Sequence, residues 1–249
     1  MKLKDRVAIV TGAASGFGAE IARQYVAEGA KVAVADIDAA GAKAVAAQLG
    51  EAAIAVACDV SKRADVDAAV AATLARFGRI DIAVNNAGFT HRNQPLLDVD
   101  EATFDRVFDV NVKSIFHMVH AVVPLMRGQK GGVILNVGST AGIRPRPGLT
   151  WYNASKGAVN LMSKSLAVEL APDNIRVNAI CPVMGATGML EAFMGMPDTP
   201  ENRSRFIATI PMGRLSEPRD IARAAVFLAS DDAGFVTGIE FPVDGGRTV

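Results

Sequence analysis

The amino-acid sequence predicts a single α/β domain, residues 1–249, with a doubly wound parallel sheet of about seven strands and helices on both faces. Short apolar segments of strand length alternate with longer segments of helical periodicity along the whole chain, and no linker or repeat separates them. Such alternation is typical of parallel strands joined by right-handed helical crossovers. With 50% hydrophobic residues, the chain is also long enough to bury one substantial core.

The first strand is predicted at residues 6–11, and a glycine-rich loop, TGAASGFG at 11–18, leads directly into a helix expected at 16–28. The loop glycines permit a tight turn and a close approach of the backbone to a phosphate. The free N–H groups and the positive dipole end of the helix then favour a pyrophosphate. This order of strand, loop and helix predicts a dinucleotide site that includes Gly12, Ser15, Gly16, Phe17 and Gly18.

The second strand, residues 31–36, ends in Asp36, at the position where a dinucleotide-binding fold has the acidic residue that binds the ribose. A carboxylate there can accept hydrogen bonds from both ribose hydroxyls and would repel a 2′-phosphate. Neither Ile37 nor Ser15 is basic, so nothing nearby would neutralise that phosphate. The pattern therefore predicts NAD(H) rather than NADP(H) as the cofactor. The alternative is that Asp36 only caps the turn into the helix expected at 39–49.

The next elements repeat the alternation of strand and helix. Strands are expected near 53–58, 80–85 and 133–138, and helices near 64–77 and 101–127. The fifth strand leads to Ser139, and the helix expected at 151–171 carries Tyr152 and Lys156 four positions apart on one face. An ammonium beside a phenol, whose reference pKa is about 10, favours the phenolate. With the serine hydroxyl holding a substrate oxygen, these side chains predict a proton-transfer site without a metal, although the spacing also occurs in ordinary surface pairs.

The last elements are a strand at 175–181, a helix at 218–229 and a strand at 238–243. Between them, residues 187–215 show no clear regularity and mix methionine and phenylalanine with glycine, proline and polar residues. A segment of this length without regular structure is usually functional or mobile. Its methionines suit an adaptable apolar wall, and the alternative is a patch of ordinary core or of subunit contact.

The separated motifs resemble those of the short-chain dehydrogenase/reductase superfamily in order and spacing, over almost the whole chain. They are the glycine loop at 11–18, Asp59 with Val60, residues 85–88 (NNAG), Asn111, and Ser139 with Tyr152 and Lys156. The resemblance implies a Rossmann-type fold and identifies residues 187–215 as a substrate-binding lid. It also implies a homotetramer, consistent with long helices at 101–127 and 151–171 that are apolar on more than one face.

The resemblance assigns roles to individual residues. Tyr152 is expected to be the general acid/base, and Lys156 to lower its pKa and bind the nicotinamide ribose. Ser139 is expected to orient the substrate oxygen, and Asn111 to hold a water in a proton relay. Further cofactor contacts are implied for Asp59, Val60, Asn86, Ala87, Gly88, Pro182, Val183 and Thr187.

Two departures from the family pattern concern the shape of the site. Val183 follows Pro182 where the family usually has glycine, and Gly185 stands where a branched residue is common. Phe17 replaces the more usual aliphatic residue of the glycine loop, with little consequence expected. Because backbone groups make most of the cofactor contacts there, we expect the cofactor geometry to be kept and the pocket near Val183 to differ.

The substrate is not identified by the sequence, but several side chains are candidates to contact it. His91 lies in the loop after the fourth strand, where such folds bind substrates, or is simply exposed. Arg92, Arg144 and Arg146 are suited to an anionic group or are solvated loop charges. Trp151 is a pocket wall or a subunit contact. Our substrate-contact set is Ser139, His91, Arg144, Trp151, Met184 and Met189.

Composition excludes several classes of function. A formal net charge of zero and a pI near 6.8 give no electrostatic signature of a nucleic-acid or membrane-surface protein. The start of the chain lacks an apolar segment long enough for a signal peptide or a membrane span. The three histidines and two cysteines show no zinc-ligand spacing. Cys58 and Cys181 are expected to be buried free thiols, as in the reducing cytoplasm.

The sequence therefore predicts an NAD(H)-dependent oxidoreductase that interconverts a secondary alcohol or polyol and its ketone. One alternative is a 3-oxoacyl carrier-protein or CoA reductase, against which Asp36 argues because such reductases commonly use NADPH. A second alternative is a dinucleotide-binding redox sensor without catalysis, which the presence of Asn111, Ser139, Tyr152 and Lys156 disfavours.

Overall fold

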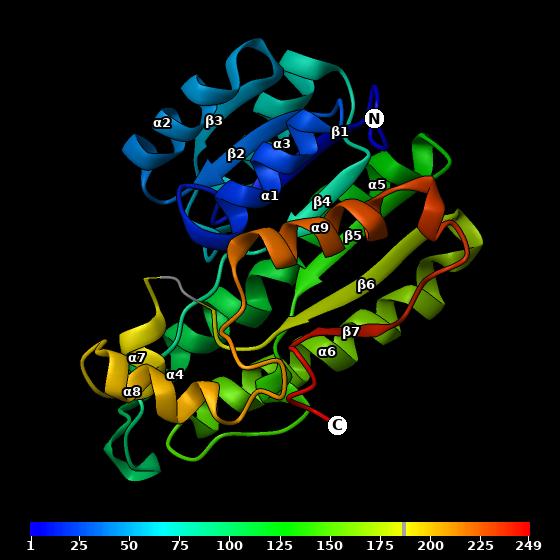
Figure 1. Ribbon diagram of the computed structural model, residues 1–249. Helices are drawn as coiled ribbons and strands as arrows, with labels where there is room; N and C mark the ends of the chain where they lie inside the picture. Colours follow the sequence, from blue (N-terminus) through cyan, green and yellow to red (C-terminus); the bar gives the residue numbers. More distant parts are fainter. Residues whose placement is uncertain (186–187) are drawn as a thin grey trace.

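The computed structural model of the chain, which describes residues 1–185 and 188–249, contains a parallel sheet (Figure 1). Within these residues the sheet has seven strands, in the spatial order β3-β2-β1-β4-β5-β6-β7. Every neighbouring pair is parallel. The strands are β1 (Val7–Thr11), β2 (Lys31–Asp36), β3 (Ala53–Ala57), β4 (Ile82–Asn85), β5 (Gly132–Val137), β6 (Ile175–Pro182) and β7 (Glu240–Val243).

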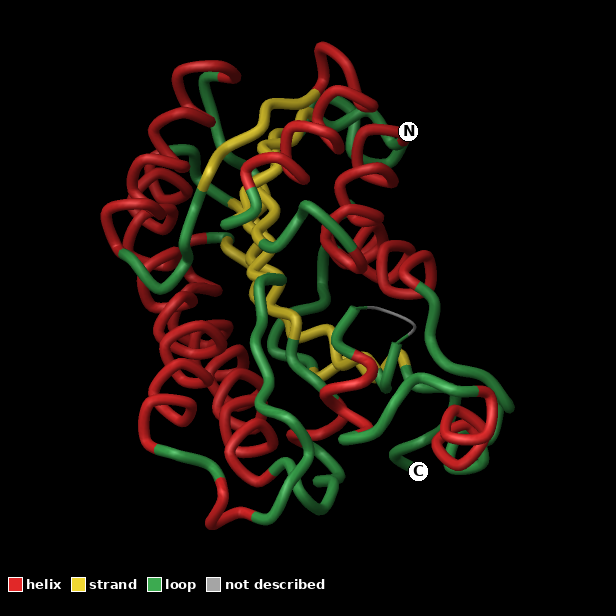
Figure 2. The backbone as a smooth tube through the Cα atoms, turned by 90° about the vertical axis from the view of Figure 1, so that its left-hand side faces the viewer, coloured by secondary structure: helices red, strands yellow, loops and turns green. Residues whose placement is uncertain are grey.

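Helices cover both faces of this sheet, which Figure 2 shows between two helical layers. Helices α1, α2 and α9 pack on one face, and α3, α5 and α6 on the other. The described helices are α1 (Gly16–Ala27), α2 (Ala39–Leu49), α3 (Arg63–Phe77), α4 (Glu101–Phe108), α5 (Ser114–Gly128), α6 (Thr150–Leu170), α7 (Leu190–Met194), α8 (Pro200–Ile207) and α9 (Pro218–Ala229). The predicted fold class, a single doubly wound α/β domain, is thereby confirmed.

Burial on both faces explains the composition of the central strands. All five residues of β1, the segment VAIVT, are buried, and β4 is buried throughout. A strand covered by helices on both sides needs a continuous apolar run, not an alternating one. The strand order reverses between β1 and β4, so the loops that follow these strands turn to opposite faces and leave a crevice between them.

Two expected elements differ from those observed. The single helix expected at 101–127 is divided into α4 and α5 by a π-helical turn, Asp109–Lys113. The stretch expected to be irregular contains α7 and α8, which lie beyond the carboxyl ends of the strands (Figure 1). Helix α8 has a recognisable start that sequence analysis missed, since Thr199 caps it by accepting from the Asn202 N–H and Pro200 occupies its first turn.

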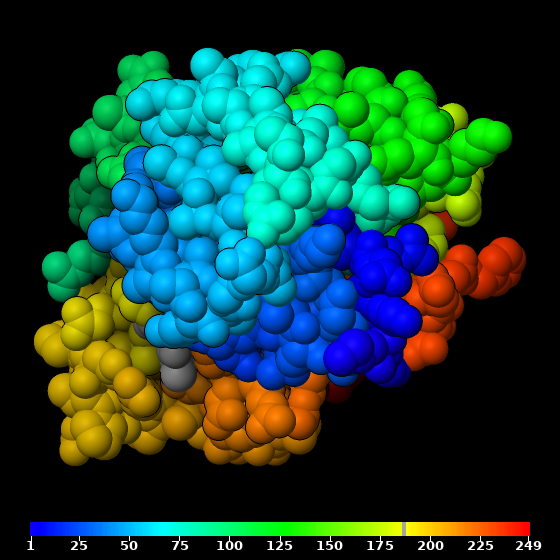
Figure 3. Space-filling model, turned by 90° about the horizontal axis from the view of Figure 1, so that it is seen from above, coloured from blue at the N-terminus to red at the C-terminus, as the bar shows by residue number. Residues whose placement is uncertain are grey.

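The part of the 187–215 segment that the structure describes packs over the carboxyl end of the sheet. Seen from above, it stands at the side of the molecule, in yellow next to the blue and cyan N-terminal part (Figure 3). Its apolar side chains form their own cluster with residues that follow β6: Val183, Met184, Leu190, Met194, Ile210 and Leu215. None of the helices within residues 1–185 and 188–249 combines the length and apolar character needed to cross a membrane.

Candidate active site

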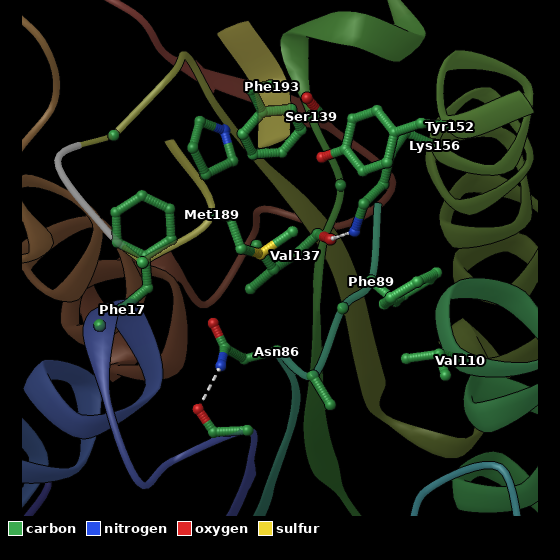
Figure 4. A pocket seen from close by; sticks show the side chains of 18 of the residues that line it. Phe17, Asn86, Phe89, Val110, Val137, Ser139, Tyr152, Lys156, Met189 and Phe193 are labelled. Carbon is green, nitrogen blue, oxygen red and sulfur yellow. Dashed lines mark hydrogen bonds between the residues drawn. The ribbon is translucent and has the colours of Figure 1, made fainter. Parts of the chain in front are cut away.

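A pocket of about 450 Å³ opens at the carboxyl ends of the central strands (Figure 4). It brings together residues from both halves of the sheet and from the 187–215 segment. Its lining includes most of the residues predicted for the site: Gly12, Ser15, Gly16, Phe17, Asp36, Asp59, Val60, Asn86, Ala87, Gly88, Ser139, Tyr152, Lys156, Pro182, Val183, Met184 and Met189. Thr187 lies outside the described residues.

The loops after β1 and β4 are joined by side-chain hydrogen bonds across the floor of this pocket. The Thr11 hydroxyl accepts from the backbone N–H groups of Asn86 and Ala87, each at 3.1 Å. The Asn86 amide in turn donates to the carbonyl oxygens of Thr11 and Gly12, at 2.8 and 3.0 Å. Because these groups bond to one another, the glycine loop keeps a fixed position beside the end of β4.

The glycine loop has the features that a pyrophosphate requires. Helix α1 begins after Ser15, whose side chain makes no capping hydrogen bond within the described chain, and Ser15, Gly16 and Phe17 at this helix start line the pocket. A methyl group on Gly12 would lie 2.8 Å from Ala87 Cα, and one on Gly18 would overlap the Gly12 carbonyl. Gly18 is outside the pocket lining and serves to bring α1 close to the loop.

Asp36 lies at the end of β2 with its carboxylate held by backbone donors. One oxygen accepts from the Ala14 N–H and the other from the Asp38 N–H, both at 2.9 Å. Ile37 beside it is 71% exposed and carries no charge to attract a phosphate. This fixed acid at the pocket wall fits a ribose with free hydroxyls and disfavours one carrying a 2′-phosphate.

Ser139, Tyr152 and Lys156 meet at the other end of the pocket, where the strand β5 ends against the start of α6 (Figure 4). The Ser139 hydroxyl caps a short turn by accepting from the Ala141 N–H at 3.0 Å, and it faces the Tyr152 phenol. The Lys156 ammonium donates to the Val137 carbonyl at 2.7 Å and lies 5.9 Å from the Tyr152 ring centroid. All three side chains are at least nine-tenths buried.

Burial dominates the protonation of this cluster. It raises the pKa of Tyr152 to about 12, while the neighbouring Ser139 hydroxyl and the Arg146 charge act in the opposite direction. It lowers the pKa of Lys156 to about 8. The direction for Tyr152 is opposite to the one expected from the sequence, because burial of the phenol outweighs the groups that favour its ionised form. In the protein alone the phenol is therefore held in its neutral form.

Asn111 lies behind these residues, in the π-helical turn between α4 and α5. Its amide group donates to the Phe89 carbonyl and to the Ser155 hydroxyl, both at 2.9 Å, and accepts from the Phe89 N–H at 2.8 Å. Ser155 in turn donates to the Tyr152 carbonyl. A methyl group on Gly88 would lie 3.5 Å from Asn111 Oδ1 and 3.7 Å from Lys156 Nζ, so these two groups approach the same point.

Phe17 and Gly185, two of the positions that depart from the family pattern, lie against each other. A methyl group on Gly185 would overlap the Phe17 ring, with 2.9 Å to its Cε1 atom. The ring therefore occupies the space that a branched residue at 185 would take. The Phe17 ring therefore fits best against glycine, and the expectation that Phe17 has little consequence for the cofactor stays a prediction.

The predicted substrate contacts are only partly brought to the pocket. Met184 and Met189 line it, and Phe193, which sequence analysis missed, packs edge-on against Tyr152 with 5.0 Å between ring centroids. His91 is buried elsewhere. Trp151 packs against Phe104 and points its indole N–H at the Leu96 carbonyl.

The three arginines whose role the sequence left undecided, Arg92, Arg144 and Arg146, lie in different places. Arg92 donates to the Gly195 carbonyl at 2.9 Å, and Arg144 to the Arg247 carbonyl at 3.0 Å. Neither is part of the pocket lining. Arg146, on the other side of Pro145, does line the pocket, and it is less exposed than Arg144. The sequence could not distinguish them because both lie in the same short loop.

Comparison with known proteins identifies the family. A family model described as enoyl-(acyl carrier protein) reductase matches residues 12–248. The chain is 52% identical, over 252 residues and the full length of both proteins, to 4-formylbenzenesulfonate dehydrogenase of Comamonas testosteroni. The chain belongs to the short-chain dehydrogenase/reductase superfamily, and its relatives are oxidoreductases.

Two solved structures share the fold closely. One is a 3-ketoacyl-(acyl-carrier-protein) reductase from Brucella melitensis complexed with NADH, with a TM-score of 0.94, 48% identity, and coverage of 99% of this chain and 100% of that one. The other is a 7α-hydroxysteroid dehydrogenase complexed with NADH and 7-oxo glycochenodeoxycholic acid. Its TM-score is 0.92, with 36% identity and coverage of 98% of this chain and 95% of that one.

The contact between Phe17 and Gly185 makes a testable prediction. Gly185→Ile should lower stability by about 1–3 kcal/mol because the new side chain overlaps the Phe17 ring. Phe17→Leu in the same chain should restore much of the loss. Thermal unfolding of the single and double variants gives the coupling energy directly. Additive losses, with no recovery in the double variant, would show that the two positions do not interact.

The ionisation of Tyr152 can be measured without interference. The chain has two tyrosines, and the other, Tyr25, is fully buried with its pKa raised even further by burial. A raised pKa keeps the phenol protonated, so the ligand-free protein should show no tyrosinate absorbance below about pH 10, the reference value for tyrosine. Ultraviolet titration of the native protein, Tyr152→Phe and Tyr25→Phe measures this. Tyrosinate near neutrality that disappears only in Tyr152→Phe would contradict the buried neutral phenol.

Proposed function

We propose that the chain is an NAD(H)-dependent oxidoreductase that interconverts a secondary alcohol and its ketone, with Tyr152 as general acid/base. The observation that carries this proposal is the arrangement of a single pocket. A phenol, a serine hydroxyl and a lysine ammonium lie at one end, and the glycine loop and Asp36 form the other. The related structures complexed with NADH support the choice of cofactor.

The residues of the pocket fit such a dinucleotide. The N–H groups at the start of α1 would hold the pyrophosphate, and Asp36 the adenosine ribose. Asp59, Val60, Asn86, Ala87 and Gly88 would line the cleft between them, with Pro182 and Val183 toward the nicotinamide. When bound, NAD(H) supplies the hydride chemistry, and the protein supplies position and proton control.

The side chains at the inner end would move the proton. In oxidation, Tyr152 takes the proton of the alcohol while the Ser139 hydroxyl donates a hydrogen bond to the substrate oxygen. Lys156 keeps a positive charge beside the phenol, anchored by its bond to the Val137 carbonyl. Asn111 holds the start of α6 in position through its hydrogen bond to Ser155. Its side-chain oxygen and the Lys156 ammonium both lie close to Gly88. In reduction the same groups act in reverse.

A second candidate function is a 3-oxoacyl carrier-protein reductase, favoured by the likeness to the Brucella melitensis protein with that activity in its description. The two functions use the same proton chemistry and differ in substrate. Rates with a panel of secondary alcohols, polyols, ketones and 3-oxoacyl thioesters, with NAD(H) and NADP(H), would separate them. A redox sensor without catalysis would turn over none of them. Turnover of 3-oxoacyl thioesters alone, with NADPH preferred, would overturn the proposal.

We also infer that residues 187–215 form the substrate-binding lid within the single domain. Met189 and Phe193 of this segment line the pocket together with Met184, and the Phe193 ring lies next to Ser139 and Tyr152 (Figure 4).

We infer a cytoplasmic location from the cysteines. Cys58 and Cys181 are buried free thiols, as is usual in a reducing compartment. Burial also raises the pKa of both thiols to about 12, which keeps them protonated.

The proton role of Tyr152 predicts the effect of removing its hydroxyl. Tyr152→Phe should lower kcat by about 10²–10⁴-fold and leave NADH affinity near native. Tyr25→Phe is the matched control, since that hydroxyl bonds the Ala225 carbonyl away from the site. Because burial raises the pKa of Tyr152 to about 12, the phenolate fraction and the oxidation rate should rise with pH in the native enzyme. A Tyr152→Phe enzyme with near-native kcat would remove the phenol from the mechanism.

Asp36 is expected to decide between the two cofactors. The double substitution Asp36→Ala with Ile37→Arg removes the charge that repels a 2′-phosphate and adds one that attracts it. The ratio of kcat/KM with NADP(H) to that with NAD(H) should rise by at least about tenfold, the equivalent of one charge-assisted contact. A native enzyme that already uses both cofactors equally well would contradict this role.

We further propose a homo-oligomer, a tetramer by family resemblance. Helix α5 exposes 54% of Phe116, and α6 exposes 65% of Leu161 and 80% of Val168, while their other faces pack on the sheet. Apolar surfaces of this kind are usually covered by a symmetry-related subunit. Light scattering should give a multiple of the chain mass, reduced in Leu161→Glu with Val168→Glu. The mass of one chain for the native protein would refute the proposal.

A further inference from the structure

Two arginine side chains near the active site have buried N–H groups without a protein acceptor. The Arg146 Nη2 atom and the Arg247 Nε and Nη1 atoms are shielded from solvent and have no hydrogen-bond partner among residues 1–185 and 188–249. A guanidinium is a donor only and is almost always paired when buried. The unused donors are therefore free to bind water or a ligand group.

The fold brings these residues together from distant parts of the sequence. Arg146 lies in the loop before α6 and lines the pocket with Tyr152 and Phe193. Arg247 is held in the C-terminal turn, where the Asp244 carboxylate accepts from the N–H groups of Gly246 and Thr248 and from the Thr248 hydroxyl. The Arg247 carbonyl accepts from Arg144 at 3.0 Å, which fixes this turn to the loop that carries Arg146.

The local charge is positive and not balanced by the protein. Burial and the nearby charge of Arg247 lower the pKa of Arg146 to about 10, and among the described residues the group that opposes this shift is the Tyr152 phenol. Burial and the charge of Arg144 also lower the pKa of Arg247, opposed by Asp244. The Asp244 oxygens are already bonded within their own turn, so this acid is a poor partner for either guanidinium.

A purely structural role does not explain this pair. Removing charges from water is costly unless they are paired, and two like charges close together add to that cost. The Arg146 guanidinium also lies over the Phe206 ring, 5.7 Å from its centroid, which positions it but offers no hydrogen-bond acceptor. Arg92, by contrast, bonds to a backbone carbonyl and has an evident structural use.

We propose that Arg146 and Arg247 bind an anionic group, a sulfonate or carboxylate, at the end of the substrate away from the reacting carbon. This rests on the proposed function, since it places the carbinol carbon at Tyr152 and Ser139. Planar guanidinium groups match the oxygens of such anions, and binding supplies the missing acceptors. Phe193 and Met189, which also line the pocket, suit an apolar body between the two polar ends. The preferred substrates are therefore secondary alcohols and ketones that carry a fixed negative charge.

The test compares substrates that differ only in charge. The probes are 4-(1-hydroxyethyl)benzenesulfonate, the corresponding benzoate and the neutral sulfonamide, each oxidised with NAD+. The native enzyme should prefer at least one of the anions over the sulfonamide by at least about tenfold in kcat/KM, as charge-assisted hydrogen bonds allow. Which anion is favoured decides between sulfonate and carboxylate. Equal kcat/KM for all three probes would overturn the proposal.

Variants assign that preference to the two arginines. Arg146→Gln and Arg247→Gln should each remove most of the preference by raising KM for the anions, with little change for the sulfonamide. Arg146→Lys should keep part of it, because it keeps the charge without the planar fork. Arg205→Gln, which removes an exposed charge from α8, is the matched control and should behave as the native enzyme. A preference retained in both Arg146→Gln and Arg247→Gln would refute the assignment.

Two further measurements separate binding from catalysis and from folding. Calorimetry of 4-methylbenzenesulfonate and of 4-methylbenzoate with the NADH-saturated enzyme reads the anion site even if none of the alcohols is oxidised. Absence of binding by both anions would overturn this proposal, whereas turnover of neutral alcohols would still uphold the proposed function.

Arg146→Gln should unfold at the native temperature or higher, because it removes an unpaired buried charge. A lowered Tm would instead indicate a structural role for Arg146 and contradict the proposal.

Discussion

The hydrogen bonds between the loops after β1 and β4 are the constraint on which the rest of the site depends. Parallel strands place their carboxyl ends at one edge, and the reversal of strand order leaves a crevice there. Thr11 and Asn86 close the base of that crevice by satisfying one another's backbone and side-chain groups. Without these bonds, polar groups in both loops would be unpaired, and the glycine loop would have no fixed position relative to the end of β4.

The titratable groups of the pocket have pKa values shifted away from their ordinary values, in the direction that disfavours the charged form. Burial opposes ionisation of Tyr152 and protonation of Lys156, and it lowers the pKa of Arg146. The surrounding sheet and helices are almost entirely apolar and closely packed, so they can support such a cluster. Strain of this kind is common at functional sites, because groups that are poorly paired in the free protein interact more strongly with a bound ligand.

Sequence reasoning succeeded where the signal was local. The glycine loop, Asp36 and the Tyr152–Lys156 spacing were all found in the expected elements, because each depends on a strand or helix of clear periodicity. It failed where the outcome depended on residues far apart in the chain. The pKa of Tyr152 is raised mainly by its burial among several elements of the fold. The contact between Phe17 and Gly185 joins two residues far apart in the chain, and neither residue alone predicts it.

The sequence by itself therefore determined the α/β class, the order of the strands and helices, and the residue types at the carboxyl edge of the sheet. Its apolar periods and glycines restrict the backbone locally, and this restriction needs no knowledge of distant contacts. The tertiary structure alone decided which of several similar side chains reach the pocket. Arg144 and Arg146 are two positions apart, yet of these two only Arg146 lines the pocket, and Arg247, from the other end of the chain, lies close enough to Arg146 to affect its pKa. Such choices follow from the direction of each side chain and from what packs against it, and these are properties of the assembled fold.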